Sequence, residues 1–145
     1  MLEPDVILAK VGNIQRCLRR ISKVTDNDPD ALNEIDKQDI FVLNLQRAIE
    51  ATIDIATHVI ASEGLGLATT IKENFKILRD AGIIGDEVMK KMQSMAGFRN
   101  IAIHDYTSID TDILKSILKN NLKDIEEFYT LILKRFNICK HICPK

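Results

Sequence analysis

The spacing of apolar residues is the feature that most restricts the fold of this chain. Apolar side chains recur every three or four residues along nearly its whole length, which is the period of a helix with one buried face. The first such stripe consists of Ile7, Val11, Ile14, Leu18 and Ile21. No segment shows the alternation of Val, Ile and Thr between turns that is typical of a strand. The sequence therefore predicts an all-α fold.

Turn-forming residues divide the chain into five helical segments. The predicted helices are a first one that carries the stripe above, one from about 36 to 62, a short one from about 69 to 80, one from about 86 into the segment at 99, and a last one after 110. The breaks fall at the Asp- and Pro-rich segment 26–30, at 64–66 and at Gly82, where Asx, Pro and Gly favour turns and helix ends. Asp110 is a good N-cap for the last helix. We therefore expect an antiparallel bundle of four long helices plus one short helix.

Length and composition indicate one globular domain that spans residues 1–145, with a core from about 5 to 136 and a tail from 137 to 145. The 145 residues are 46% hydrophobic and 28% charged, as in ordinary soluble domains. No run approaches the roughly 18 apolar residues of a membrane span, and the first residues lack the order of a signal peptide. The three cysteines are too few for a disulfide framework, so we expect a reducing, cytoplasmic location.

Charge and metal-ligand patterns restrict the function classes. A net charge of −1 argues against broad electrostatic binding to nucleic acid but permits a few well-placed phosphate contacts. A cluster of basic residues at Arg16, Arg19, Arg20 and Lys23 is typical of a solvated helix face. Cys139, His141 and Cys143 lack a usual zinc spacing and a fourth ligand. We therefore expect no metal and no cofactor.

The segment from Arg99 to Tyr106 concentrates side chains that suit work on a phosphodiester. The guanidinium of Arg99 can pair bidentately with phosphate oxygens. His104 can take and give a proton near neutral pH. Tyr106 adds a hydroxyl that can orient a substrate or be modified itself.

Helical geometry limits how these groups can work together. At about 100° per residue, Arg99 and Tyr106 lie within roughly 20° of each other, whereas His104 lies about 140° from Arg99. A straight helix therefore cannot aim Arg99 and His104 at one small target. Either the helix ends at or just before His104, or a second chain supplies the complementary half of the site, and both can hold.

The same segment resembles the R-N-x-x-x-H-x-Y signature of HEPN domains, in particular the HepT-like (DUF86) branch of bacterial toxin–antitoxin pairs. The likeness extends to residues 45–60, which resemble the second helix of the family, to 75–84, and to the approach at 95–100. It covers the chain from about 5 to 136. We see no departure from the motif that would argue against activity.

This resemblance implies a metal-independent endoribonuclease that works at the cleft of a homodimer. His104 would act as the general base on the ribose 2′-hydroxyl or as the acid on the leaving 5′-oxygen, and Arg99 would stabilise the phosphorane charge. Asn100 would orient the phosphate or the histidine. The products would be a 2′,3′-cyclic phosphate and a 5′-hydroxyl, from mRNA or tRNA.

The resemblance also implies a protein partner. The antitoxin of this branch resembles a minimal nucleotidyltransferase that transfers AMP to the motif tyrosine, here Tyr106, which would block the cleft. Arg47 and Asp54 match charged positions of the second helix of the family and are expected to face the same cleft. The alternative is a non-catalytic helical adaptor that binds a nucleotidyltransferase, which the near-neutral charge favours and the intact motif does not.

Overall fold

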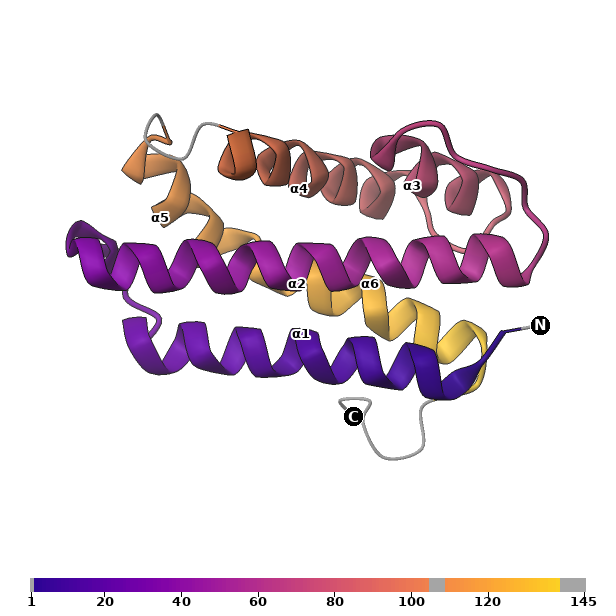
Figure 1. The fold of residues 1–145 in the computed structure, drawn as a ribbon, viewed down its shortest axis with the longest axis horizontal. Helices are drawn as coiled ribbons and strands as arrows, with labels where there is room; N and C mark the ends of the chain where they lie inside the picture. The colour runs from indigo at the N-terminus through magenta and orange to yellow at the C-terminus, as the bar shows by residue number, and fades with distance from the viewer. Residues whose placement is uncertain (1, 105–108, 139–145) are drawn as a thin grey trace.

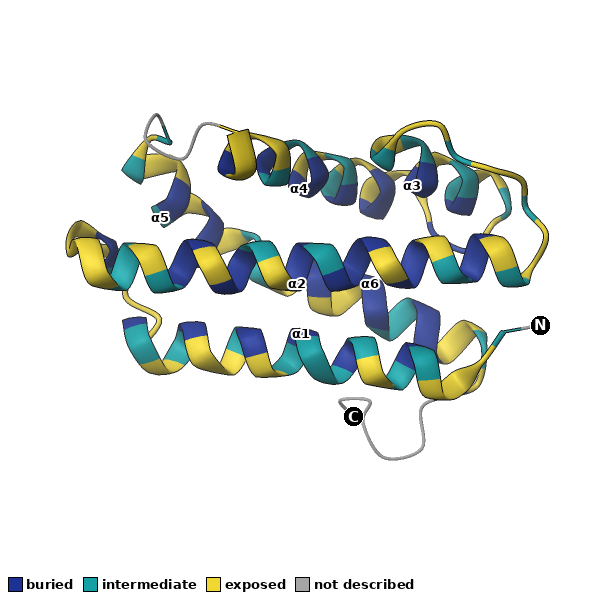
Figure 2. Ribbon diagram, viewed as in Figure 1, coloured by how far each residue is buried: buried dark blue, intermediate teal, exposed yellow. Residues whose placement is uncertain are grey.

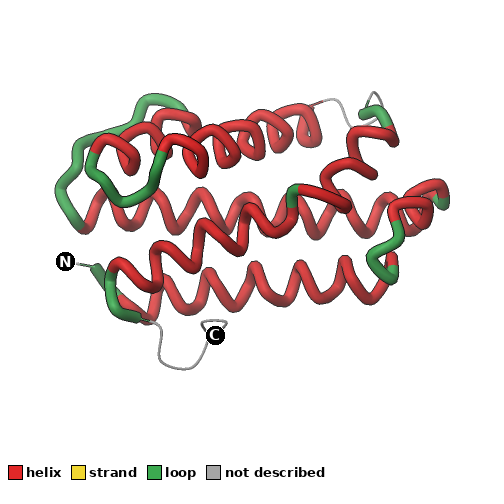
Figure 3. Tube along the Cα trace, turned by 180° about the vertical axis from the view of Figure 1, so that it is seen from behind, coloured by secondary structure: helices red, strands yellow, loops and turns green. Residues whose placement is uncertain are grey.

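The computed structural model describes residues 2–104 and 109–138, and within these ranges every regular element is helical (Figure 3). The all-α prediction is confirmed. The helices are α1 (Pro4–Thr25), η1 (a 3₁₀ helix, Pro29–Asn33), α2 (Ile35–Ser62), α3 (Ile71–Asp80), α4 (Asp86–His104), α5 (Thr111–Asn120) and α6 (Leu122–Arg135). None of the helices in the described ranges is both long and apolar enough to cross a membrane.

α1 and α2 form an antiparallel hairpin along the length of the molecule (Figure 1). α1 ends where predicted, because Asp26 and Asn27 adopt left-handed backbone angles, with φ of 53° and 59°. The Asp26 N–H donates to the Ser22 carbonyl at 2.8 Å, which closes the last turn. The carboxylate of Asp28 then caps η1 by accepting from the Asp30 N–H. The Asx- and Pro-rich break is thus a cap followed by a short 3₁₀ turn.

α2 is the central helix of the bundle, with α1 on one side and α3 and α4 on the other (Figure 1). α6 packs against both α2 and α4. The long buried face of α2 explains this position, since the burial pattern leaves only narrow exposed stripes along it (Figure 2). The residues predicted to form this face are all buried: Val42, Leu45, Ile49, Ile53, Ala56, Val59 and Ile60.

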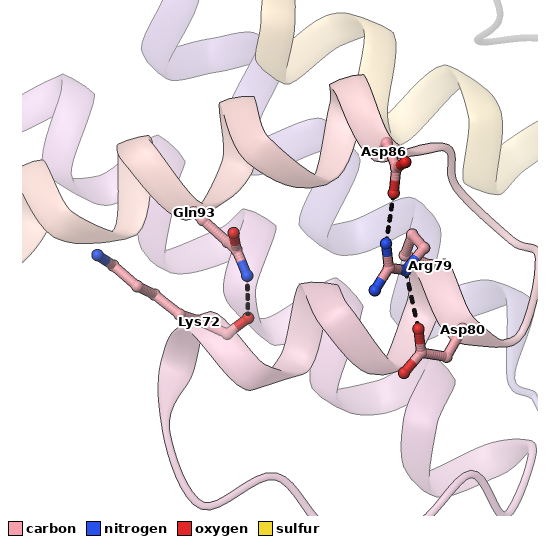
Figure 4. Close-up of polar contacts among 5 residues, drawn as sticks. All are labelled: Lys72, Arg79, Asp80, Asp86 and Gln93. Carbon is pink, nitrogen blue, oxygen red and sulfur yellow. Dashed lines mark hydrogen bonds and ion pairs between the residues drawn. The ribbon is translucent and has the colours of Figure 1, made fainter.

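Polar contacts fix α3 against the first half of α4 (Figure 4). Arg79 on α3 pairs with Asp86 at 2.5 Å, where α4 begins, and with Asp80 at 2.8 Å. In the first turn of α3, the Lys72 carbonyl accepts from the Gln93 side-chain amide at 3.2 Å. Gly82, with φ of 75°, makes the turn between the two helices, a backbone angle that other residues rarely adopt. These contacts therefore hold in place the first half of α4, the helix that leads into the motif segment.

The prediction of one continuous last helix is wrong in detail. The chain forms two helices, α5 and α6, separated at Asn121, whose side-chain amide donates to Asp124 at 3.0 Å. The Asn side chain competes with the backbone hydrogen bonds of a helix. The apolar period continues through the break at Asn121, so the period alone could not predict that break. The break lets α5 pack on η1 while α6 crosses to α2 and α4. The predicted cap at Asp110 is confirmed, since its side chain accepts from the Asp112 N–H at 2.9 Å.

Candidate active site

The end of α4 carries the candidate catalytic residues. Arg99 is half-buried, and Asn100 and His104 are exposed. α4 continues as a helix through His104, so Arg99 and His104 remain about 140° apart around its axis. Of the two solutions to the angular problem, the first is restricted: the helix does not end before His104, because α4 includes His104 as its last residue. Tyr106, the predicted AMP acceptor, lies outside the described residues.

Arg99 is held from the neighbouring helix by Glu50. The Arg99 Nε–H donates to a carboxylate oxygen of Glu50 on α2, and the Nη1 group donates to the Asn100 side-chain oxygen at 3.3 Å. A guanidinium has five N–H donors, and these two bonds use two of them. The other three donors, five minus two, make no hydrogen bond within the described residues and suit a phosphate. Glu50 thus orients the guanidinium.

Glu50 also lines a groove between α1 and α2, which has a volume of about 470 Å³. Arg47 and Asp54, the two residues expected near the cleft, line the same groove. Asp54 pairs with Lys10 of α1 at 2.9 Å, whereas Arg47 is exposed. The structure therefore places both beside Glu50 and, through it, next to Arg99. Their role in the reaction stays a prediction.

The pKa of the Cys17 thiol, which lines this groove, is affected by burial and by nearby basic side chains. Burial raises the pKa of Cys17, and the positive charges of Arg47 and Arg16 oppose that effect. Both arginines therefore lie close enough to Cys17 to act on it electrostatically. Because burial raises its pKa, the Cys17 thiol stays largely protonated at neutral pH.

Glu50 is the site residue that the sequence interpretation missed. A signal for it exists, because Arg47, Glu50 and Asp54 follow one another at intervals of three and four along α2. That spacing places all three on one helix face. α1 carries a matching polar stripe, with Lys10, Asn13, Arg16 and Arg20 in the groove lining.

Other potential ligands lie apart from this site. The His58 Nε2 accepts from the Glu3 backbone N–H at 3.2 Å and so ties the start of α1 to α2. Within the described ranges, no three His, Cys, Asp or Glu side chains are grouped to hold a metal ion. Cys139, His141 and Cys143 lie outside those ranges.

Sequence comparison places the motif in a known family. The chain belongs to the HepT-like family, since a model described as "Ribonuclease HepT-like" matches residues 14–132. It is similar to the mRNA nuclease HepT of Shewanella oneidensis, with 34% identity over 128 residues that cover 88% of this chain and 96% of the relative. It is also similar to the tRNA nuclease HepT of Aphanizomenon flos-aquae, with 30% identity over 110 residues, 75% of each chain.

Solved structures agree with this assignment. A tri-AMPylated HEPN toxin of Shewanella oneidensis, in complex with an MNT antitoxin, superposes with a TM-score of 0.84 at 34% identity. A toxin–antitoxin structure with AMP-PNP superposes with a TM-score of 0.85 at 33% identity. Each match covers 90% of this chain and 98% of the other. The predicted HEPN-like bundle is thereby confirmed.

Proposed function

We propose that this chain is a metal-independent endoribonuclease toxin whose site is built from Arg99 and His104. The observation that carries the proposal is the Arg99–Glu50 contact, which fixes the guanidinium edge of a side chain that is 21% exposed, on the helix that bears His104. Such an edge suits the dispersed charge of a phosphorane. Relatives named as mRNA and tRNA nucleases support the same reaction class.

In the proposed reaction the RNA supplies its own nucleophile. The 2′-hydroxyl loses its proton, its oxygen bonds to the adjacent phosphorus, and the bond from phosphorus to the 5′-oxygen breaks. The leaving oxygen takes up a proton, which gives a 2′,3′-cyclic phosphate and a 5′-hydroxyl. His104 serves as the base or as the acid, Arg99 stabilises the charge, and Asn100 helps to orient Arg99. DNA has no 2′-hydroxyl and is not cut.

We propose a homodimer as the working form, because one straight helix cannot direct Arg99 and His104 at one phosphate. The outer surface of α4 beside His104 supports it. Ile101 and Ile103 are 52% and 42% exposed there, and Ile113 on α5 is 51% exposed. Ile101 and Ile113 line one hollow between α4 and α5, which a second copy would remove from water, whereas Ile103 lies about 160° from Ile101 around α4. Arg99 of one chain would then work with His104 of the other.

We further propose that a nucleotidyltransferase antitoxin controls the toxin by transferring AMP to Tyr106. The Tyr106 oxygen would bond to the α-phosphorus of ATP, with loss of pyrophosphate and of the phenolic proton. The negative charge and the volume of AMP, two residues from His104, would repel an RNA phosphate. The AMPylated relative bound to an MNT antitoxin supports this control. Both partners would act in the cytoplasm.

Mass spectrometry of RNA incubated with the chain in excess EDTA tests the catalytic proposal. We expect fragments ending in 2′,3′-cyclic phosphate from the wild-type chain and none from His104→Ala or Arg99→Ala. Absence of cleavage by protein with unmodified Tyr106, measured as intact mass, would contradict catalysis and support the adaptor function. A substrate with sulfur in place of the leaving 5′-oxygen then assigns the proton transfer. Sulfur leaves without protonation, so it rescues His104→Ala only if His104 is the acid.

A further inference from the structure

The groove between α1 and α2 carries more positive charge than the composition of the chain would suggest. Its lining contains the cations Lys10, Arg16, Arg20 and Arg47 and the anions Glu50 and Asp54. Both carboxylates are engaged, Glu50 by Arg99 and Asp54 by Lys10. In the described part of the chain, no salt bridge engages the three arginines. A chain with a net charge of −1 thus collects three uncompensated guanidinium groups in one groove.

Such an arrangement indicates an anionic ligand. Like charges on a shared wall repel one another, and a ligand that carries several negative charges relieves that repulsion. Arg16 donates to the side-chain oxygen of Asn13, and Arg16, Arg20 and Arg47 are all exposed. Arginine forks are suited to phosphate oxygens, which they contact in pairs.

The position of the groove identifies the ligand. Lys10 and Arg20 are ten residues apart on α1, which corresponds to about 15 Å of groove length. On the α2 side the groove lining runs from Asn44 to Asp54 and includes Glu50, whose other contact is Arg99. A phosphodiester at Arg99 would therefore continue directly into the row of arginines. No aromatic residue lines the groove, so it offers no surface for base stacking.

We infer that the groove formed by Lys10, Arg16, Arg20 and Arg47 holds the backbone phosphates of single-stranded RNA next to the scissile phosphodiester. The inference rests on the proposed ribonuclease function and adds a substrate-binding track to it. The track recognises phosphates, so its contribution to binding does not depend on base sequence and weakens with salt.

The test is RNA binding by a variant that lacks the three arginines. Arg16→Gln, Arg20→Gln and Arg47→Gln are combined in the full chain with His104→Ala, which prevents cleavage of the labelled single-stranded oligonucleotide. The matched control combines Arg19→Gln, Lys119→Gln and Lys123→Gln, which removes the same charge from a separate hollow between α1 and α5–α6. Fluorescence anisotropy gives the Kd from 50 to 200 mM salt. Circular dichroism confirms that each variant is folded.

Each phosphate contact to a single strand contributes about 0.7 to the slope of log K against log salt, so loss of three contacts lowers the slope by about 2. Over a fourfold increase in salt, the parent would then lose about 20-fold more affinity than the groove variant. The control variant should keep the parental slope. Equal slopes in groove variant and parent, equal losses in both triple variants, or no RNA binding by the parent would each overturn the inference.

The wild-type cleavage assay separates this inference from the proposed function. If the wild-type chain cleaves RNA but the groove variant binds RNA as the parent does, the substrate-binding track is contradicted and the catalytic proposal is not. Groove-dependent binding without cleavage contradicts the catalytic proposal alone. If the groove variant binds RNA normally but loses affinity for an acidic protein partner, the groove is a protein-docking surface instead.

Discussion

The contact between Glu50 and Arg99 gives the sharpest prediction for a single residue. Replacing Glu50 by Ala removes the acceptor of the Arg99 Nε–H and leaves the guanidinium free to move. Replacing it by Gln removes the charge but keeps a side-chain oxygen that can accept the same bond. The two variants therefore separate the positioning of Arg99 from the neutralisation of its charge.

The structure sets the expected magnitudes. The Arg99 and Glu50 side chains are 21% and 39% exposed, so solvent screens the pair, and its loss should lower the free energy of unfolding by less than about 1 kcal/mol. An arginine side chain carries about 2 kcal/mol of rotamer entropy. Losing that constraint in the transition state would reduce kcat by up to about 30-fold. Folding should thus change little while catalysis changes strongly.

The assay is steady-state cleavage of a fluorogenic RNA, with urea unfolding of the same preparations. We expect kcat to fall in the order wild type, Glu50→Gln, Glu50→Ala, with KM unchanged or lower because a negative charge has left the groove. Glu63→Gln, at the exposed end of the same helix, is the control and should leave kcat unchanged. Wild-type kcat in Glu50→Ala would refute a positioning role for Glu50.

Three further predictions concern stability. Thr70→Ala removes the acceptor of the Glu73 N–H at 3.1 Å and should destabilise the chain by about 1 kcal/mol in urea unfolding, whereas Thr70→Ser should not. Phe128→Ala empties a fully buried site in edge contact with Phe75 at 5.6 Å and should lower the unfolding free energy by about 3–5 kcal/mol. A loss below about 1 kcal/mol would contradict this packing. Burial raises the pKa of Tyr129, so its contribution is complete below the unfolded value of about 10 and is lost as pH rises through the folded value. The urea midpoint of wild type should therefore fall more steeply between pH 9 and 12 than that of Tyr129→Phe, and parallel curves would disprove the effect.

The apolar period predicted the fold well because each helix buries one stripe. Helix starts with a side-chain cap, such as Asp110, were also readable, since a cap is a local property. The break at Asn121 was not, because the buried stripe of α5 continues in register into α6. Only the packing of α5 on η1 makes two helices preferable to one.

The sequence predicted the motif residues of the site but not the residues that surround them. Arg99 and His104 share a short segment, whereas the partner of Arg99 lies 49 residues away on α2. From the sequence, the basic residues of α1 were predicted to form one solvated helix face. The structure divides them instead, with Arg16 and Arg20 in the groove and Arg19 in a different hollow. Which side of a helix meets a neighbour depends on tertiary packing, which the linear pattern does not contain.

The most direct test of the composite site is complementation between two inactive variants. Arg99→Ala and His104→Ala are purified separately, mixed in equal amounts under conditions that exchange subunits, and assayed for RNA cleavage in EDTA. If each site takes Arg99 from one chain and His104 from the other, half of the dimers are mixed and each has one intact site, which restores about one quarter of wild-type activity. No recovery, with exchange verified by mass, would contradict a site shared between two chains.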